Sequence, residues 1–162
     1  MLKVQQGFTL IEFIFVIMLL GIIAAISSQM LTQGVMAYFT ATNVVDANWQ
    51  GQLAIQRMMR DMSIVRSSND ISTANTNTFS FTDINGNTVS YALSGSSLSL
   101  TYNSNALILA DGLQSLTFQY YDKNGAITAT NNLIRYVKMT LNFSYKNTIY
   151  AVISAVYLRN CS

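Results

Sequence analysis

An apolar run that contains a single acid constrains this chain more than any other feature of its sequence. Residues 8–26 read FTLIEFIFVIMLLGIIAAI, and no charged residue occurs between Glu12 and Asp46. A helix needs about 20 mostly apolar residues to cross the hydrocarbon core of a bilayer, and this run has about that length. The chain has 162 residues, so enough of it remains beyond the run for one domain of ordinary size.

The sequence around the run allows two interpretations. In a secretory signal, MLKVQQ at residues 1–6 would supply the basic residue, and Ala25, Ile26 and Ser27 would loosely resemble a cut site. Glu12 argues against a signal, because a carboxylate in a membrane span costs on the order of 3 kcal/mol and a dispensable segment would avoid it. We therefore expect a retained membrane helix whose basic leader stays on the cytoplasmic side.

Composition excludes several classes of function. Histidine is absent, which removes Ser-His and Cys-His nucleophiles and a common metal ligand. The acids after Ser27 are scattered over mostly separate predicted loops and turns, so we expect no catalytic site, no cofactor and no metal. A secreted enzyme released near Ser27 is therefore a weak alternative. The net charge is +2 without a block of Lys or Arg, so we expect no nucleic acid partner.

Residues 29–66 are predicted to continue the helix beyond the membrane. They contain no proline and few glycines, and apolar side chains recur at helical spacing to form one stripe. The stripe consists of Ile55, Met58, Met59, Met62 and Val65. Arg57, Arg60 and Asp61 fall largely outside it, so this face is expected to meet water or other subunits. The stripe itself is expected to pack on a sheet.

Residues 67–162 are predicted to form an antiparallel β domain. Residues 67–78 lack periodicity and are expected to be a surface loop. Alternating apolar residues then predict strands, with a tight turn at Asn85 and Gly86. The predicted strands cover residues 79–81, 89–93, 98–102, 116–120, 137–145 and 149–158. One long helix followed by antiparallel strands is an α+β arrangement.

Two local patterns have a structural and a functional interpretation. Asp83, Asn85 and Asn87 alternate like the oxygen ligands of a calcium loop, but the glycine and glutamate that such loops require are missing, so a hairpin turn is favoured. Cys161 has no partner within the chain for a disulfide, and we expect a frayed terminal thiol.

The residues from Gly7 to Glu12, GFTLIE, resemble the processing signature of type IV pilins and type II secretion pseudopilins. The resemblance implies that residues 1–7 are a prepilin leader and that a prepilin peptidase cuts between Gly7 and Phe8. It also implies methylation of the new N-terminus at Phe8. Residues 8–28 would then remain as the membrane anchor and later form the filament core.

The resemblance gives Glu12 and Gly21 candidate roles. Cleavage creates an ammonium on Phe8, and Glu12 is placed to neutralise the Phe8 ammonium of a neighbouring subunit, since a buried charge needs a partner. Alternatively, Glu12 extends to the interface and pairs with lipid head groups. Gly21 either loosens the helix locally, at about 1 kcal/mol relative to alanine, or allows close packing against a neighbour.

A second, looser resemblance extends into the β domain. Residues 109–122 with Asn124 and Gly125, and residues 156–160, resemble J-type pseudopilins and W-type minor pilins. This implies a pilin-like fold and a minor subunit of a pilus or a type II secretion pseudopilus, assembled at the filament tip. Its partners would be prepilin peptidase, other pilin subunits and inner-membrane lipid, with the β domain in the periplasm. A tip adhesin that binds ligands through a tyrosine-bearing sheet edge is the alternative.

Overall fold

The computed structural model describes residues 9–145 and 148–161. Gly7 and Phe8, the predicted cleavage residues, lie outside these ranges. The chain divides into two compact units, one ending at Thr42 and the other beginning at Asn43, and each is treated by itself below. Helix α1, Leu10–Met62, contributes its first part to one unit and its last part to the other.

In the first unit α1 is apolar on all sides. All of its large apolar side chains from Leu10 to Phe39 are solvent-exposed, and Val16, the least exposed of them, is still 45% exposed. The hydroxyls of Thr32, Thr40 and Thr42 donate to the backbone carbonyls four residues earlier, at 2.8 to 3.0 Å. These bonds satisfy the hydroxyls within the helix, so the segment can enter an apolar environment without unpaired donors at those positions.

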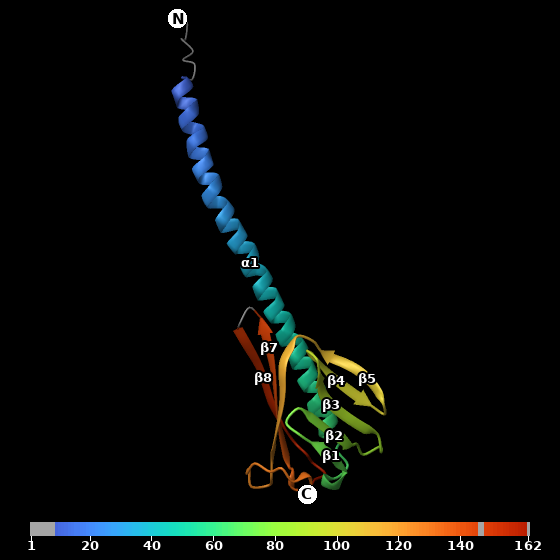
Figure 1. Cartoon of the computed structure of the whole chain (residues 1–162). Coiled ribbons are helices and arrows are strands. Elements are labelled where there is room, and N and C mark those ends of the chain that lie inside the picture. The colour runs from blue at the N-terminus through green and yellow to red at the C-terminus, as the bar shows by residue number, and fades with distance from the viewer. Residues whose placement is uncertain (1–8, 146–147, 162) are drawn as a thin grey trace, which may run out of the picture. The chain divides into compact units, whose positions relative to one another are not determined.

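The second unit contains the last turns of α1 and two antiparallel sheets (Figure 1). A 3-10 turn, η1 at Ser68–Asp70, connects the helix to the first sheet. That sheet has five strands in the order β1-β2-β3-β4-β5. Their bounds are β1 Ile71–Ala74, β2 Thr78–Thr82, β3 Thr88–Ser94, β4 Ser97–Tyr102 and β5 Asn105–Ala110.

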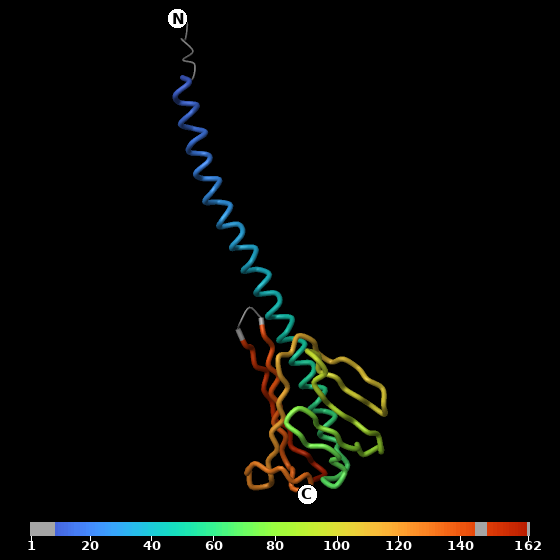
Figure 2. Tube along the Cα trace, in the orientation of Figure 1, coloured from blue at the N-terminus to red at the C-terminus, as the bar shows by residue number. Residues whose placement is uncertain are grey.

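The second sheet has three strands in the order β6-β7-β8, so β6 and β8 are its edges. Their bounds are β6 Leu113–Tyr121, β7 Tyr136–Tyr145 and β8 Thr148–Tyr157, and the 3-10 turn η2, Asn131–Leu133, precedes β7. The trace in Figure 2 shows the last turns of α1 with strands of the two sheets on either side. The order of helix and antiparallel strands confirms the predicted α+β fold.

The core of the second unit lies where the last turns of α1 meet both sheets. Met58 and Met62 are fully buried among the inward residues of the strands, as the predicted stripe requires. Gly51 lies so close to the three-stranded sheet that an added Cβ would be 2.8 Å from a ring carbon of Phe143 and 3.0 Å from Val152. The helix therefore approaches this sheet closely at a residue without a side chain.

Several predicted boundaries differ from the structure. The helix ends at Met62 rather than Arg66, and the predicted loop at 67–78 contains η1 and strand β1. Strand β1 is held by backbone pairing with β2, in which Ile71 faces Phe81, rather than by an alternating apolar pattern. Strand β5 was not predicted, because its sequence NALILA does not alternate and its Leu107 and Ile108 are both exposed.

Two predicted exposures were wrong. Asp61 is only 8% exposed, because it follows Met58 by three residues and so turns with the buried face. Cys161 is not a frayed thiol: it is fully buried in the core, and its backbone N–H donates to the carbonyl of Leu158 at 3.2 Å. Burial raises the pKa of the Cys161 thiol, which keeps it protonated and unreactive.

Candidate functional site

The start of α1 is organised by Thr9 and Glu12. The backbone N–H of Glu12 approaches the Thr9 hydroxyl oxygen at 3.4 Å, and the N–H of Phe13 donates to the Thr9 carbonyl at 3.3 Å. Thr9 thus precedes the helix as its cap, and Glu12 is the third residue of the first turn. A carboxylate at this end of a helix is favoured by the helix dipole. The Glu12 side chain is exposed and free to meet another molecule.

The other predicted site residues are Gly7, Phe8 and Gly21. Gly7 and Phe8 lie outside the described residues, so the pairing of Glu12 with the Phe8 ammonium stays a prediction. Gly21 lies within the continuous helix α1, and an added Cβ there would meet nothing within 4 Å in the chain. The two roles expected of Gly21 stay predictions.

Among the residues that the structure describes, the helix surface around Glu12 is exposed. The most apolar 18-residue window of α1 has a mean hydropathy of 2.7 and is 0% buried. By length and composition α1 is able to cross a membrane. An apolar surface of this extent on a single helix requires lipid or other helices around it.

Residues 2–28 match the family described as the prokaryotic N-terminal methylation motif. The chain carries a type IV prepilin-like methylation motif. Together with the α+β architecture, the methylation motif supports a pilin-like family and implies processing by prepilin peptidase and assembly with other pilins. The motif and the apolar helix also fit anchoring in the inner membrane. No curated protein matches the chain.

A charged cluster centred on the buried Asp61 lies in the second unit. The carboxylate of Asp61 accepts hydrogen bonds from Nε of Arg57 and from the hydroxyl of Tyr91, both at 2.7 Å, and Nε of Arg60 lies 3.4 Å from its other oxygen. The hydrogen bond from Arg57 to Asp61 raises the pKa of Arg57. Burial of Tyr91, together with the hydrogen bond that Tyr91 donates to Asp61, raises the pKa of Tyr91. The cluster joins the helix to β3 and has the properties of a structural ion pair.

The calcium-like pattern at Asp83 is a turn, as predicted. One oxygen of Asp83 accepts from the backbone N–H groups of Asn85 and Asn87, and the other from the Asn87 side chain, at 2.8 to 3.0 Å. Burial alone would raise the pKa of Asp83, but these hydrogen bonds together lower it. Within residues 9–145 and 148–161, no three His, Cys, Asp or Glu side chains gather as metal ligands would.

Sequence reasoning did not assign a role to Thr9 or to Gly51. A signal for Thr9 was present, since a threonine three residues before a glutamate is the spacing of a helix capping box. No local signal marks Gly51, because its role depends on Phe143, which is distant in sequence.

Proposed function

We propose that this chain is a minor type IV pilin or type II secretion pseudopilin. It is cut by prepilin peptidase between Gly7 and Phe8, methylated on Phe8, and assembled at the tip of a filament. The observation that supports this most is the methylation motif at residues 2–28, which includes the start of helix α1. Among the described residues of the first unit, the large apolar side chains of this helix are all exposed. The chain has no enzymatic role in this proposal.

Before assembly, the apolar part of α1 is a single membrane span, and the second unit lies in the periplasm. This topology follows from the positive-inside tendency of the leader, whose Lys3 is its only charge. On assembly the helix leaves lipid and packs among the helices of other pilins. The exchange is feasible because lipid and packed helices both offer an apolar environment to side chains such as Phe15 and Leu20.

In the proposed mechanism, Glu12 directs the transfer of the helix from lipid into the filament. The ammonium on Phe8 becomes surrounded by apolar helices, where an unpaired charge is strongly unfavourable. The Glu12 carboxylate of a neighbouring subunit neutralises it. Because the cap at Thr9 uses the backbone N–H of Glu12 and not its side chain, the carboxylate remains available. Each subunit can then both supply and receive one such contact.

The matched variants Glu12→Ala and Glu12→Gln test this mechanism. Both keep the backbone N–H that meets Thr9, so both should insert in the membrane and begin α1 as before. Neither should enter filaments at the wild-type level, whereas Glu12→Asp should retain part of the incorporation. The measurement is the amount of the protein in purified filaments relative to the membrane. Normal incorporation of Glu12→Ala would contradict charge pairing.

A tip adhesin is the second candidate, and one observation favours it. Tyr136 and Tyr157 lie on neighbouring strands, 40% and 47% exposed, with ring centroids 5.0 Å apart. Exposed tyrosine pairs are suited to binding, since each ring is apolar with one polar end. If they bind a ligand, the variant Tyr136→Ala with Tyr157→Ala should reduce adherence of cells while its incorporation into filaments stays normal. Unchanged adherence would remove this candidate.

A further inference from the structure

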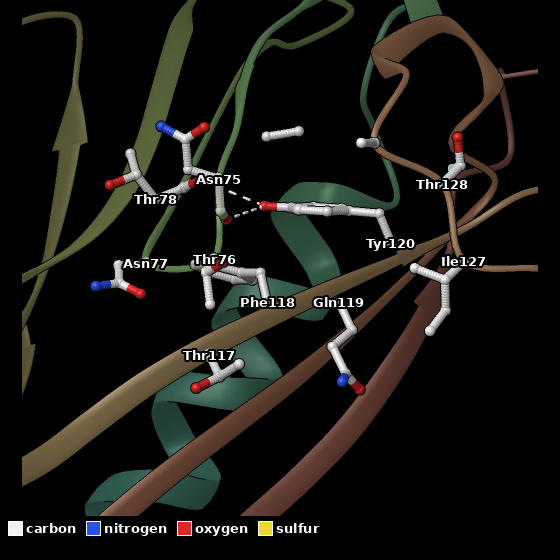
Figure 3. Close-up of a pocket in the computed structure, with 12 residues that line it drawn as sticks. Asn75, Thr76, Asn77, Thr78, Thr117, Phe118, Gln119, Tyr120, Ile127 and Thr128 are labelled. Atoms are coloured by element: carbon white, nitrogen blue, oxygen red, sulfur yellow. Dashed lines mark hydrogen bonds between the residues drawn. The ribbon is translucent and has the colours of Figure 1, made fainter.

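A pocket of about 750 Å³ lies beside the free edge of β6. One wall is the turn between β1 and β2, with Asn75, Thr76 and Asn77, and the other is the segment containing Ile127 and Thr128. Figure 3 shows these two walls on opposite sides of the Tyr120 ring. None of the twelve lining residues is charged, and most carry hydroxyl or carboxamide groups. The pocket therefore suits an uncharged ligand that forms hydrogen bonds.

The Tyr120 side chain holds one wall in place. Its hydroxyl donates to the carbonyl of Asn75 at 2.7 Å and lies 3.3 Å from that of Thr78 (Figure 3). Burial raises the pKa of Tyr120, so the hydroxyl stays a neutral donor. The ring is 5% exposed and forms part of the inner lining. The turn is thus fixed relative to β6, which makes the pocket a preformed feature of the fold.

The edge of β6 is paired at both ends of the pocket and open between them. The N–H of Phe118 donates to the carbonyl of Thr76 at 2.7 Å, and the carbonyl of Tyr120 accepts from the N–H of Thr128 at 3.0 Å. In an antiparallel ladder the N–H and C=O of one residue point to the same side. The Phe118 carbonyl and the Tyr120 N–H therefore point away from β7, and among the described residues no cross-strand partner meets them.

We propose that this pocket binds an uncharged, extended peptide segment, one residue of which pairs with β6 opposite Gln119. A parallel strand places one residue so that its N–H bonds the carbonyl of residue i−1 and its C=O bonds the N–H of residue i+1. The Phe118 carbonyl and the Tyr120 N–H are this pair. The hydroxyls and carboxamides of the two walls then bond the flanking peptide groups. Thr76 and Thr128 limit the paired stretch to a single residue.

The probe is an acetylated and amidated heptapeptide of alternating threonine and asparagine, added to the full-length ¹⁵N-labelled chain in detergent micelles. In the free protein the Tyr120 N–H should exchange quickly with solvent. Peptide at about ten times its Kd should slow that exchange about tenfold, because protection follows the bound fraction. The same peptide with every backbone nitrogen methylated should give no protection. These results need no processing or filament assembly, so they are independent of the function proposed above.

Two matched variants locate the effect. Ala129→Trp fills the pocket from an exposed lining position and should abolish protection of Tyr120, whereas Ala126→Trp, exposed but outside the lining, should leave it intact. The proposal is overturned if the free Tyr120 N–H already exchanges slowly, if the N-methylated peptide protects equally, or if the peptide leaves Tyr120 unprotected. Protection by chitotriose but not by the peptide would also overturn it, in favour of a saccharide site.

Discussion

The two parts of α1 are both rich in apolar residues, yet only the second part packs into a hydrophobic core. In the first unit the large apolar side chains from Leu10 to Phe39 are exposed on every face of the helix. In the second unit Met58 and Met62 are fully buried, while Arg60 remains exposed. The difference lies in periodicity, because a helix that is apolar on one side packs on a sheet and one that is apolar all round needs an apolar solvent. One helix thus serves two environments.

An acid placed in each part of α1 should have a different effect in the two parts. Met58→Asp should destabilise the second unit by more than about 4 kcal/mol and prevent its folding, since it buries an unpaired charge. Ile17→Asp should leave the unfolding of the second unit unchanged and instead weaken membrane insertion, by about 3 kcal/mol. Denaturant unfolding followed by circular dichroism, together with membrane fractionation, measures both. Equal destabilisation by the two variants would contradict the division.

The variant Asp61→Ala tests how much a buried acid near the end of α1 contributes to stability. Asp61→Ala should lower the free energy of unfolding by about 2 kcal/mol, because the Tyr91 hydroxyl then stays buried without an acceptor. Tyr91→Phe removes that hydroxyl, so the double variant should be less destabilised than the sum of the two single variants. Strict additivity in a double-mutant cycle would show that the 2.7 Å contact contributes nothing.

The sequence predicted those parts of the fold whose signal is local. The stripe with Met58 and Met62, and the turn at Asn85 and Gly86, are patterns of a few residues, and the structure contains them. Asp61 was misplaced although it shares the helix face of Met58, because the partner of its carboxylate, the Tyr91 hydroxyl, is thirty residues away in the sequence. From the sequence alone, a polar side chain is predicted to be exposed unless a buried partner can be identified.

At the candidate sites, only the residues with a local sequence signal could be predicted. Glu12 stands out within its own run, since one acid among apolar residues is anomalous, and Thr9 stands at capping distance from it. The pocket beside β6 had no such signal, because it forms only where the turn at Asn75 meets a strand that comes more than forty residues later. Burial of Cys161 was unpredictable for the same reason: its position in the core depends on the path of the chain after β8.

Glycine substitutions compare the two parts on a smaller scale. Gly51→Ala should destabilise the second unit by about 1 kcal/mol, because overpacking against Phe143 outweighs the better helix propensity of alanine. Gly21→Ala, in the open first part, should leave the unfolding of the second unit unchanged. Thermal unfolding of both variants in the same detergent gives the comparison. A stabilised Gly51→Ala variant would mean that the Phe143 ring moves aside easily and that α1 is not tightly packed on the sheet at this position.

The smallest expected effect is a pH dependence confined to the second unit. The hydrogen bonds at Asp83 lower its pKa in the folded chain, so the stability they provide is complete above about pH 4, the unfolded value. That stability is lost as the pH falls through the folded pKa. Asp83→Asn should be less stable than wild type at neutral pH, and the difference should shrink in acid. A difference that is constant from pH 7 to pH 2 would contradict this.

The most direct test of prepilin processing is the intact mass and N-terminal sequence of the protein recovered from the membranes of its native host. Cleavage between Gly7 and Phe8 predicts a chain that begins at N-methylated Phe8 and retains the whole of α1. A chain that begins near Ser28 would show an ordinary secreted protein whose apolar segment is discarded. In that case Glu12 would have no place in a filament, and the proposed function would fall.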